Sequence, residues 1–189
     1  LLFGYPAFAA TDADYYPVSL LNNRLGGCGF ASQLTQELRE GKGYTYGVQS
    51  RFSGSTNTGE FTVNSAVRTN VTYESASLIK EILENYGENF NENDLEVTKS
   101  YMIKSGARAF ETLNSKLYML TNISNYGYSD DYAKQRENIV KALTVEEVKA
   151  LADKYIHPDK MIYLIVGDAA TQLDRLESLG LGKPVVLNK

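Results

Sequence analysis

The sequence predicts an α+β fold, a two-layer sandwich with an antiparallel-dominated sheet covered by helices. Residues 44–52 and 60–67 alternate apolar with polar residues and are rich in β-branched and aromatic types, a pattern typical of strands. The segment between them, 53–59, consists of Ser, Gly, Thr and Asn, which favours a turn and therefore an antiparallel hairpin. Helical periodicity then prevails from residue 71 to the apolar run at 161–166. Helices packed on a mainly antiparallel sheet explain this order of elements.

The N-terminal segment 1–10 is apolar and aromatic. We expect it to form a strand at or near a sheet edge, because Pro6 has no amide hydrogen to donate to a neighbouring strand. Helix-capping residues follow at 11–14, and apolar residues then recur at helical spacing over 15–25. Gly26-Gly27 is expected to end this helix.

A second, shorter helix is expected over 31–40. Leu34 and Leu38 form its apolar stripe, and Arg39 lies in its last turn, where a cation interacts favourably with the helix dipole. Tyr46 follows seven positions after Arg39, on the first strand of the hairpin. We therefore expect the arginine and the tyrosine to face one another across a glycine-containing loop.

The second half of the chain is expected to be mainly helical. Thr144 and Glu147 have the spacing of a capping box at the start of a helix that reaches Tyr155. The run at 161–166 is continuously apolar, which indicates a fully buried strand. Further helices are expected at 71–86, from 92 to about 126 with a kink or break near Gly106, at 131–142 and at 170–179.

The length allows one large domain or two small ones, and the composition, 43% apolar and 22% charged, is that of an ordinary globular protein. No interdomain linker is evident, so we expect a single domain, 1–189. A net charge of −4 without a basic block argues against nucleic acid as a partner. No apolar run reaches the roughly 20 residues that a membrane span needs. Leu1 is not an initiator Met and no signal peptide is evident, so we expect a domain excised from a longer protein. The compartment stays open between the cytoplasm and the periplasm of a bacterial cell.

The chain lacks the residues of a complete hydrolytic site. Its one histidine, His157, precedes Pro158 in an expected turn, whereas zinc hydrolysis and Ser–His–Asp catalysis each depend on well-placed imidazoles. The acidic pairs at 130–131 and 146–147 lie at helix starts, where capping and the helix dipole explain them. We therefore expect no catalytic residue, no metal site and no cofactor in this domain.

The glycine-rich segment 25–29 suggests two further hypotheses. It could cradle a phosphate, but no Lys-Ser/Thr pair follows at P-loop spacing, and a helix rather than a strand precedes it. Cys28, the single cysteine, could be a nucleophile, but no histidine lies near it in the sequence. A small packed residue is the simpler interpretation of Cys28.

A longer pattern runs through the same region: Leu25-Gly26-Gly27, Ser32, Leu34, Leu38-Arg39-Glu40, Gly43 and Tyr46. It resembles the C-terminal-type domain of the insulinase, or pitrilysin-like, zinc peptidases of family M16, which include mitochondrial processing peptidase and the core proteins of the cytochrome bc1 complex. Gln33 departs from the arginine that many members carry after the serine. Similar motifs extend over nearly the whole chain, at 14–27, 126–132, 139–148, 154–159 and 166–168.

The resemblance implies the LuxS/M16 peptidase-like fold and a role without catalytic residues. Members of the family pair two halves around a closed chamber, and an HxxEH zinc motif in one half performs catalysis. That motif is absent from this chain. An arginine and a tyrosine of the opposite half reach the substrate, and Arg39 and Tyr46 match their positions. The expected partners are therefore an HxxEH-bearing, zinc-binding domain or subunit and a peptide or unfolded polypeptide substrate.

Elementary chemistry supports this role for the pair. A guanidinium donates hydrogen bonds to peptide carbonyls without being consumed, and a phenol can donate to a developing oxyanion. Spacing alone favours a simpler interpretation, in which Arg39 is a helix-end cation and Tyr46 a hairpin residue packed on the sheet; the resemblance shifts the balance to the substrate-binding role. Two other functions stay open: a scaffold or assembly subunit that has lost peptidase activity, and an independent peptide-binding module.

Overall fold

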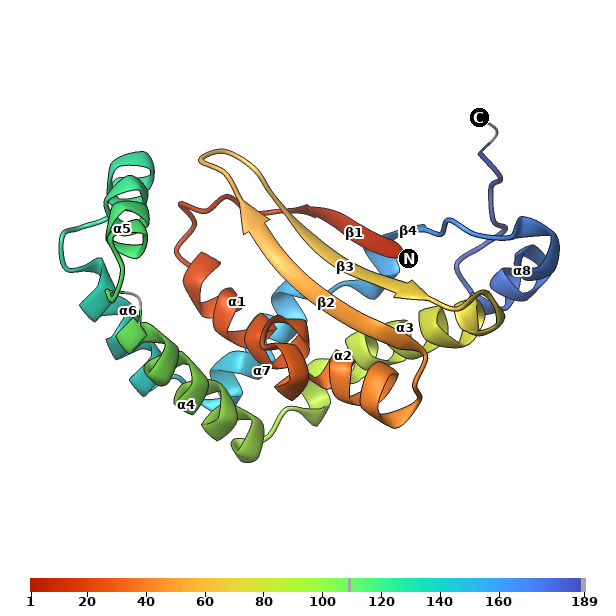
Figure 1. Cartoon of the computed structure of the whole chain (residues 1–189), viewed down its shortest axis with the longest axis horizontal. Coiled ribbons are helices and arrows are strands. Elements are labelled where there is room, and N and C mark those ends of the chain that lie inside the picture. The colour runs from red at the N-terminus through yellow and green to blue at the C-terminus, as the bar shows by residue number, and fades with distance from the viewer. Residues whose placement is uncertain (109, 188–189) are drawn as a thin grey trace.

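The computed structural model describes residues 1–108 and 110–187 and confirms the predicted α+β class (Figure 1). The strands are β1 (Leu2–Ala7), β2 (Thr45–Gly54), β3 (Gly59–Val67) and β4 (Ile162–Leu164). The α-helices are α1 (Tyr15–Asn22), α2 (Gln33–Thr35), α3 (Thr72–Asn89), α4 (Glu92–Arg108), α5 (Leu113–Tyr126), α6 (Tyr132–Ala142), α7 (Val145–Tyr155) and α8 (Ala169–Leu176). Helices α1, α2, α3 and α7 lie together on one side of the sheet, whereas α5 stands away from it.

The described strands form one antiparallel sheet in the order β2-β3-β1-β4. The hairpin prediction is confirmed, since β2 pairs with β3 down to Gly54 opposite Gly59. Segment 1–10 is expected at or near a sheet edge, and β1 lies next to the edge strand β4, pairing with both β3 and β4. Pro6 is tolerated there because β4 pairs only with residues 2–4, so no strand lies beside the proline on that side.

Strand β4 forms one edge of the sheet, and the prediction of a fully buried strand at 161–166 is wrong. Ile162 is 72% exposed and Leu164 is 41% exposed. Tyr163 points to the covered face, where its ring centroid lies 4.5 Å from that of Phe3. The apolar run indicated burial on both faces, but the described helices cover only one.

The hydrophobic core lies between the sheet and the helix layer. Side chains alternate along β3, so that Phe61 and Val63 are buried while Glu60 and Asn64 are exposed. This period of two is the signature of a strand that packs on one face. Fully buried core residues come from both layers and include Phe3, Leu20, Leu21, Leu25, Leu34, Leu38, Ile79 and Val148.

Several predicted helices differ in detail from those observed. The helix predicted over 15–25 starts as α1 but widens into a π-helix, Asn23–Gly27, before the glycines end it. The long helix predicted over 92–126 is divided into α4 and α5, with Gly106 still inside α4. The capping box that begins α7 is confirmed.

Candidate functional site

Arg39 lies in a π-helical turn, Gln36–Gly41, that continues α2. Leu34 and Leu38 are fully buried and anchor this segment to the core. The Arg39 side chain is 31% exposed, so it is only partly buried. The apolar stripe predicted from the sequence therefore fixes the backbone that carries the arginine.

A glycine in the left-handed region reverses the chain after this turn. Gly43 has φ of +61° and donates from its amide to the Arg39 carbonyl at 3.0 Å, and the Tyr44 amide donates to the Leu38 carbonyl at 2.8 Å. Such bonds satisfy the free carbonyls at a helix end. The Gly43 carbonyl in turn accepts a hydrogen bond from the Arg68 guanidinium at 3.1 Å. These three hydrogen bonds fix the backbone at Gly43 and Tyr44, between the π-helical turn and β2.

Tyr46 sits in a β-bulge at the start of β2. The register with β3 shifts between Thr45 and Val48. The bulge is fixed by two hydroxyls: the Gly47 amide donates to Thr45 Oγ1 at 3.1 Å, and Ser65 Oγ donates to the Gly47 carbonyl at 3.0 Å. Bulges re-aim side chains away from the sheet. As a result, Tyr46 is 89% exposed.

The structure brings the two predicted residues together and adds a third. Arg39 Cζ lies 5.1 Å from the ring centroid of Tyr46 and 4.5 Å from that of Phe30. Arg39 Nε lies 3.4 Å from Glu40 Oε1, an exposed ion pair that adds little stability. Within residues 1–108 and 110–187, no hydrogen bond engages the Tyr46 hydroxyl or the Arg39 Nη atoms. Among these residues, the Tyr46 hydroxyl and the Arg39 Nη atoms therefore have no hydrogen-bond partner.

Sequence reasoning missed Phe30. It lies in a 3₁₀ turn, Gly29–Ala31, between the two short helices, and its side chain is 63% exposed. The signal available in the sequence was a large apolar residue in a glycine-rich turn, outside the apolar stripe of either helix.

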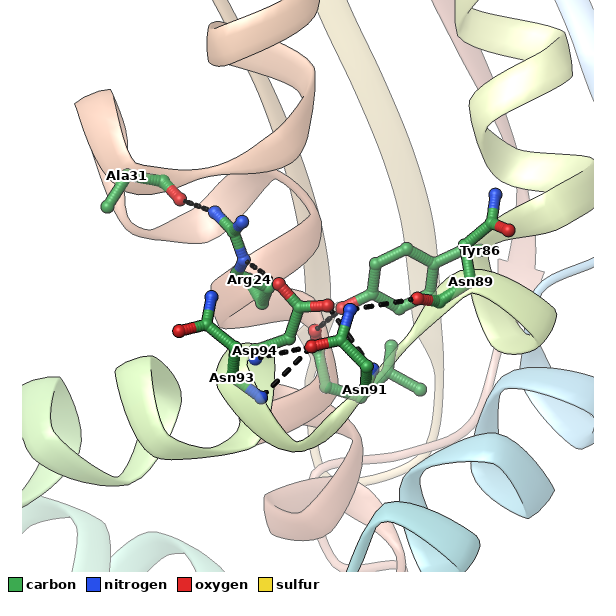
Figure 2. A network of polar contacts seen from close by, with 8 residues as sticks. Arg24, Ala31, Tyr86, Asn89, Asn91, Asn93 and Asp94 are labelled. Atoms are coloured by element: carbon green, nitrogen blue, oxygen red, sulfur yellow. Dashed lines mark hydrogen bonds and ion pairs between the residues drawn. The ribbon is translucent and has the colours of Figure 1, made fainter.

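An ion pair fixes the turn that carries Phe30 (Figure 2). Arg24 donates from Nε to Asp94 Oδ1 at 2.7 Å and from Nη1 to the Ala31 carbonyl. Asp94 also accepts from the Asn91 amide at 3.3 Å, at the start of α4. The Arg24 and Asp94 side chains are only 20% and 15% exposed. The Gly29–Ala31 turn is therefore tied to the first turn of α4.

The glycine-rich segment packs closely on the sheet. A Cβ atom on Gly26 would lie 2.3 Å from Ser50 Oγ and 2.4 Å from the Ser50 amide nitrogen, so no larger residue fits there. Cys28 is 9% exposed, and burial raises the pKa of its thiol, which disfavours the reactive thiolate. These contacts support a packing role for Gly26 and Cys28.

His157 is engaged with its own turn. Its Nε2 atom lies 2.9 Å from the Lys154 carbonyl oxygen. In the part of the chain that the structure describes, no group of three or more His, Cys, Asp or Glu side chains could hold a metal ion. The residues present do not fit the zinc site of a hydrolase, which needs three or four such ligands. Among the described residues, no helix is both long and apolar enough to cross a membrane.

The fold defines a helix-covered antiparallel sheet domain, and comparison with known proteins supplies its family. Residues 1–102 match the family model of the peptidase M16 inactive domain, so the chain belongs to this family. The uncharacterized zinc protease YmxG of Bacillus subtilis is 29% identical over 168 residues, which cover 87% of this chain and 40% of that protein. An uncharacterized zinc protease of Streptomyces coelicolor is 33% identical over 88 residues, which cover 47% of this chain and 19% of that protein.

Comparison with solved structures also finds peptidase M16 domains and proteases of similar fold. A peptidase M16 inactive domain from Pseudomonas fluorescens is 30% identical, with a TM-score of 0.77, and the match covers 85% of this chain and 38% of that one. A protease from Helicobacter pylori has the same TM-score at 17% identity, with coverage of 85% and 39%. An inactive peptidase domain from Bordetella parapertussis has a TM-score of 0.70 at 14% identity, with coverage of 88% and 90%. The last two show the fold alone.

The chain therefore spans at most about two fifths of the length of the curated relatives that it matches. It is an inactive M16 peptidase domain of zinc protease-like proteins. The family prediction made from the motifs is confirmed. The roles of Arg39 and Tyr46 stay a prediction.

Proposed function

We propose that this domain supplies the non-catalytic side of a zinc metallopeptidase active site. Arg39 and Tyr46 would bind the peptide substrate, opposite a zinc ion held by an HxxEH-bearing domain or subunit. The observation that carries the proposal is the juxtaposition of the two side chains: Arg39 Cζ lies 5.1 Å from the Tyr46 ring, Tyr46 is 89% exposed and the Arg39 side chain is 31% exposed. The names of the relatives, which are zinc proteases, support the reaction class.

The chemistry of the pair suits an extended peptide. The guanidinium presents N–H donors that match carbonyl oxygens and stays charged at any physiological pH. The phenol hydroxyl can donate to a carbonyl oxygen as negative charge develops on it. Neither group acts as a nucleophile or base, which agrees with a domain that positions substrate and leaves bond cleavage to its partner.

The test uses the full-length protein together with its HxxEH-bearing partner. Arg39→Ala and Tyr46→Phe are each expected to lower kcat/KM for peptide cleavage by about tenfold or more, because each removes a donor to the substrate. Tyr118→Phe is the matched control, since Tyr118 is 70% exposed on α5, away from the site. Unchanged folding is checked by circular dichroism.

Wild-type rates in both variants would refute the assignment. A stoichiometric, high-affinity zinc site in this 189-residue chain alone, measured by calorimetry, would also contradict it. The scaffold alternative makes a different prediction: loss of this domain would impair assembly, while Arg39→Ala would change nothing.

A further inference from the structure

Phe30 is an exposed aromatic residue on a rigid turn. Each carbonyl of the Gly29–Ala31 turn accepts a side-chain hydrogen bond: from Ser32 Oγ at 2.8 Å, from Gln36 Nε2 and from Arg24 Nη1. The turn is therefore fixed at every residue. The Phe30 ring nevertheless contributes little to the core, since it is 63% exposed.

The ring lies against Arg39. Arg39 Cζ is 4.5 Å from the Phe30 centroid, closer than the 5.1 Å to Tyr46. A cation over an aromatic face is attracted by the ring quadrupole. With Glu40 at Nε, the guanidinium is engaged by two rings and one carboxylate, which leaves its Nη groups as the available donors.

Three separate segments thus fix one guanidinium: the 3₁₀ turn, the π-helical turn and the β2 bulge. An arginine side chain otherwise populates many rotamers, and ordering it on binding would weaken the interaction. We propose that Phe30 is a positioning residue that holds the Arg39 guanidinium so that its Nη groups point to a main-chain carbonyl of the bound peptide. This inference rests on the proposed function of Arg39.

The first measurement concerns positioning alone and needs no substrate. In NMR spectra of this chain, Phe30→Leu is expected to shift the Arg39 Nε–Hε resonance and to lower the order of its side chain, because a ring that contacts the guanidinium is lost. Phe30→Tyr retains the ring and should preserve both the Arg39 Nε–Hε resonance and the order of the Arg39 side chain. Tyr118→Leu, an exposed aromatic on α5, should leave Arg39 unchanged. An Arg39 side chain equally ordered in Phe30→Leu would overturn the proposal.

The second measurement uses the assembled peptidase. Phe30→Leu is expected to raise KM by about two- to fivefold, the effect of one exposed cation–π contact, and Phe30→Tyr to restore it. In the Arg39→Ala background, Phe30→Leu should have no further effect, because the group it positions is gone. If the effects of Phe30→Leu and Arg39→Ala on KM were additive in the double variant, the proposal would be overturned.

The two measurements separate the two hypotheses. Arg39→Ala with wild-type activity would defeat the proposed function, whereas the NMR result would still decide whether Phe30 positions the guanidinium. A lower order of Arg39 in Phe30→Leu with an unchanged KM would refute the link between positioning and peptide binding.

Discussion

Gly26→Ala is expected to destabilise the domain, although it adds a single methyl group. The new Cβ would lie 2.4 Å from the Ser50 amide nitrogen and 2.9 Å from Leu34 Cδ1. Ser50 belongs to β2 and is 3% exposed, and its hydroxyl donates to Asn22 Oδ1 at 2.6 Å. The obstacle is therefore a strand backbone in a buried network, which cannot move aside as a flexible side chain can.

The magnitude follows from this geometry. Overpacking a core typically costs about 1–3 kcal/mol. Because the contact with Ser50 involves the backbone, we expect about 3 kcal/mol for Gly26→Ala. For a chain of this length, about 1 kcal/mol corresponds to a change in Tm of 2–4 °C. Tm should therefore fall by about 6–12 °C.

The assay is urea and thermal unfolding followed by far-ultraviolet circular dichroism. Gly106→Ala is the matched control: nothing lies within 4 Å of the position of its added Cβ. Because Gly106 lies inside α4, alanine there should stabilise the domain by about 0.5–1 kcal/mol. A Gly26→Ala variant with an unchanged Tm would refute the reasoning. Ser50→Ala removes the hydroxyl but leaves the backbone nitrogen in place. Recovery of the Tm in the double variant Gly26→Ala/Ser50→Ala would therefore also refute the reasoning.

Two further predictions concern the ion pair of Figure 2 and alkaline stability. Asp94→Ala should lower the free energy of unfolding by about 1–2 kcal/mol, because it leaves Arg24 unpaired and removes a cap from α4. Glu137→Ala, which breaks an exposed pair with Lys141, should have no measurable effect on urea unfolding, and equal effects would contradict the prediction. Burial raises the pKa of Tyr5 to about 12, so its contribution to stability is present below about pH 10 and is lost as the pH rises towards 12. Tyr5→Phe should flatten the dependence of the free energy of unfolding on pH between about pH 10 and 12, because phenylalanine does not titrate. An unchanged slope would show that the Tyr5 hydroxyl does not cause the loss of stability.

The family and most elements could be predicted because their signals are local. The turn residues at 53–59 specify the hairpin, and Thr144 with Glu147 specifies the start of α7. Buried Leu34 and Leu38 follow from helical spacing. Each of these features depends on residues a few positions apart, which a sequence displays directly.

The errors concern features set by residues far apart in the chain. Segment 1–10 is predicted at or near an edge, but which strand forms that edge depends on the pairing of β1 with β4, which Pro6 alone could not reveal. The exposure of β4 depends on whether a second layer covers its outer face, which an apolar run does not report. The contact of Phe30 with Arg39 depends on the Gly29–Ala31 turn, which the ion pair between Arg24 and Asp94, 70 residues apart in the chain, ties to α4.

The interior position of β1 has a consequence for how the domain folds. Residues 2–4 pair with residues 162–164, so this ladder cannot form until all of the intervening chain has been synthesised. Pairings so distant in sequence raise the contact order and slow folding. The family match stops at residue 102, yet Val148 of α7 is fully buried. A fragment cut at that boundary would expose both the sheet and the core, and we expect it to aggregate rather than fold.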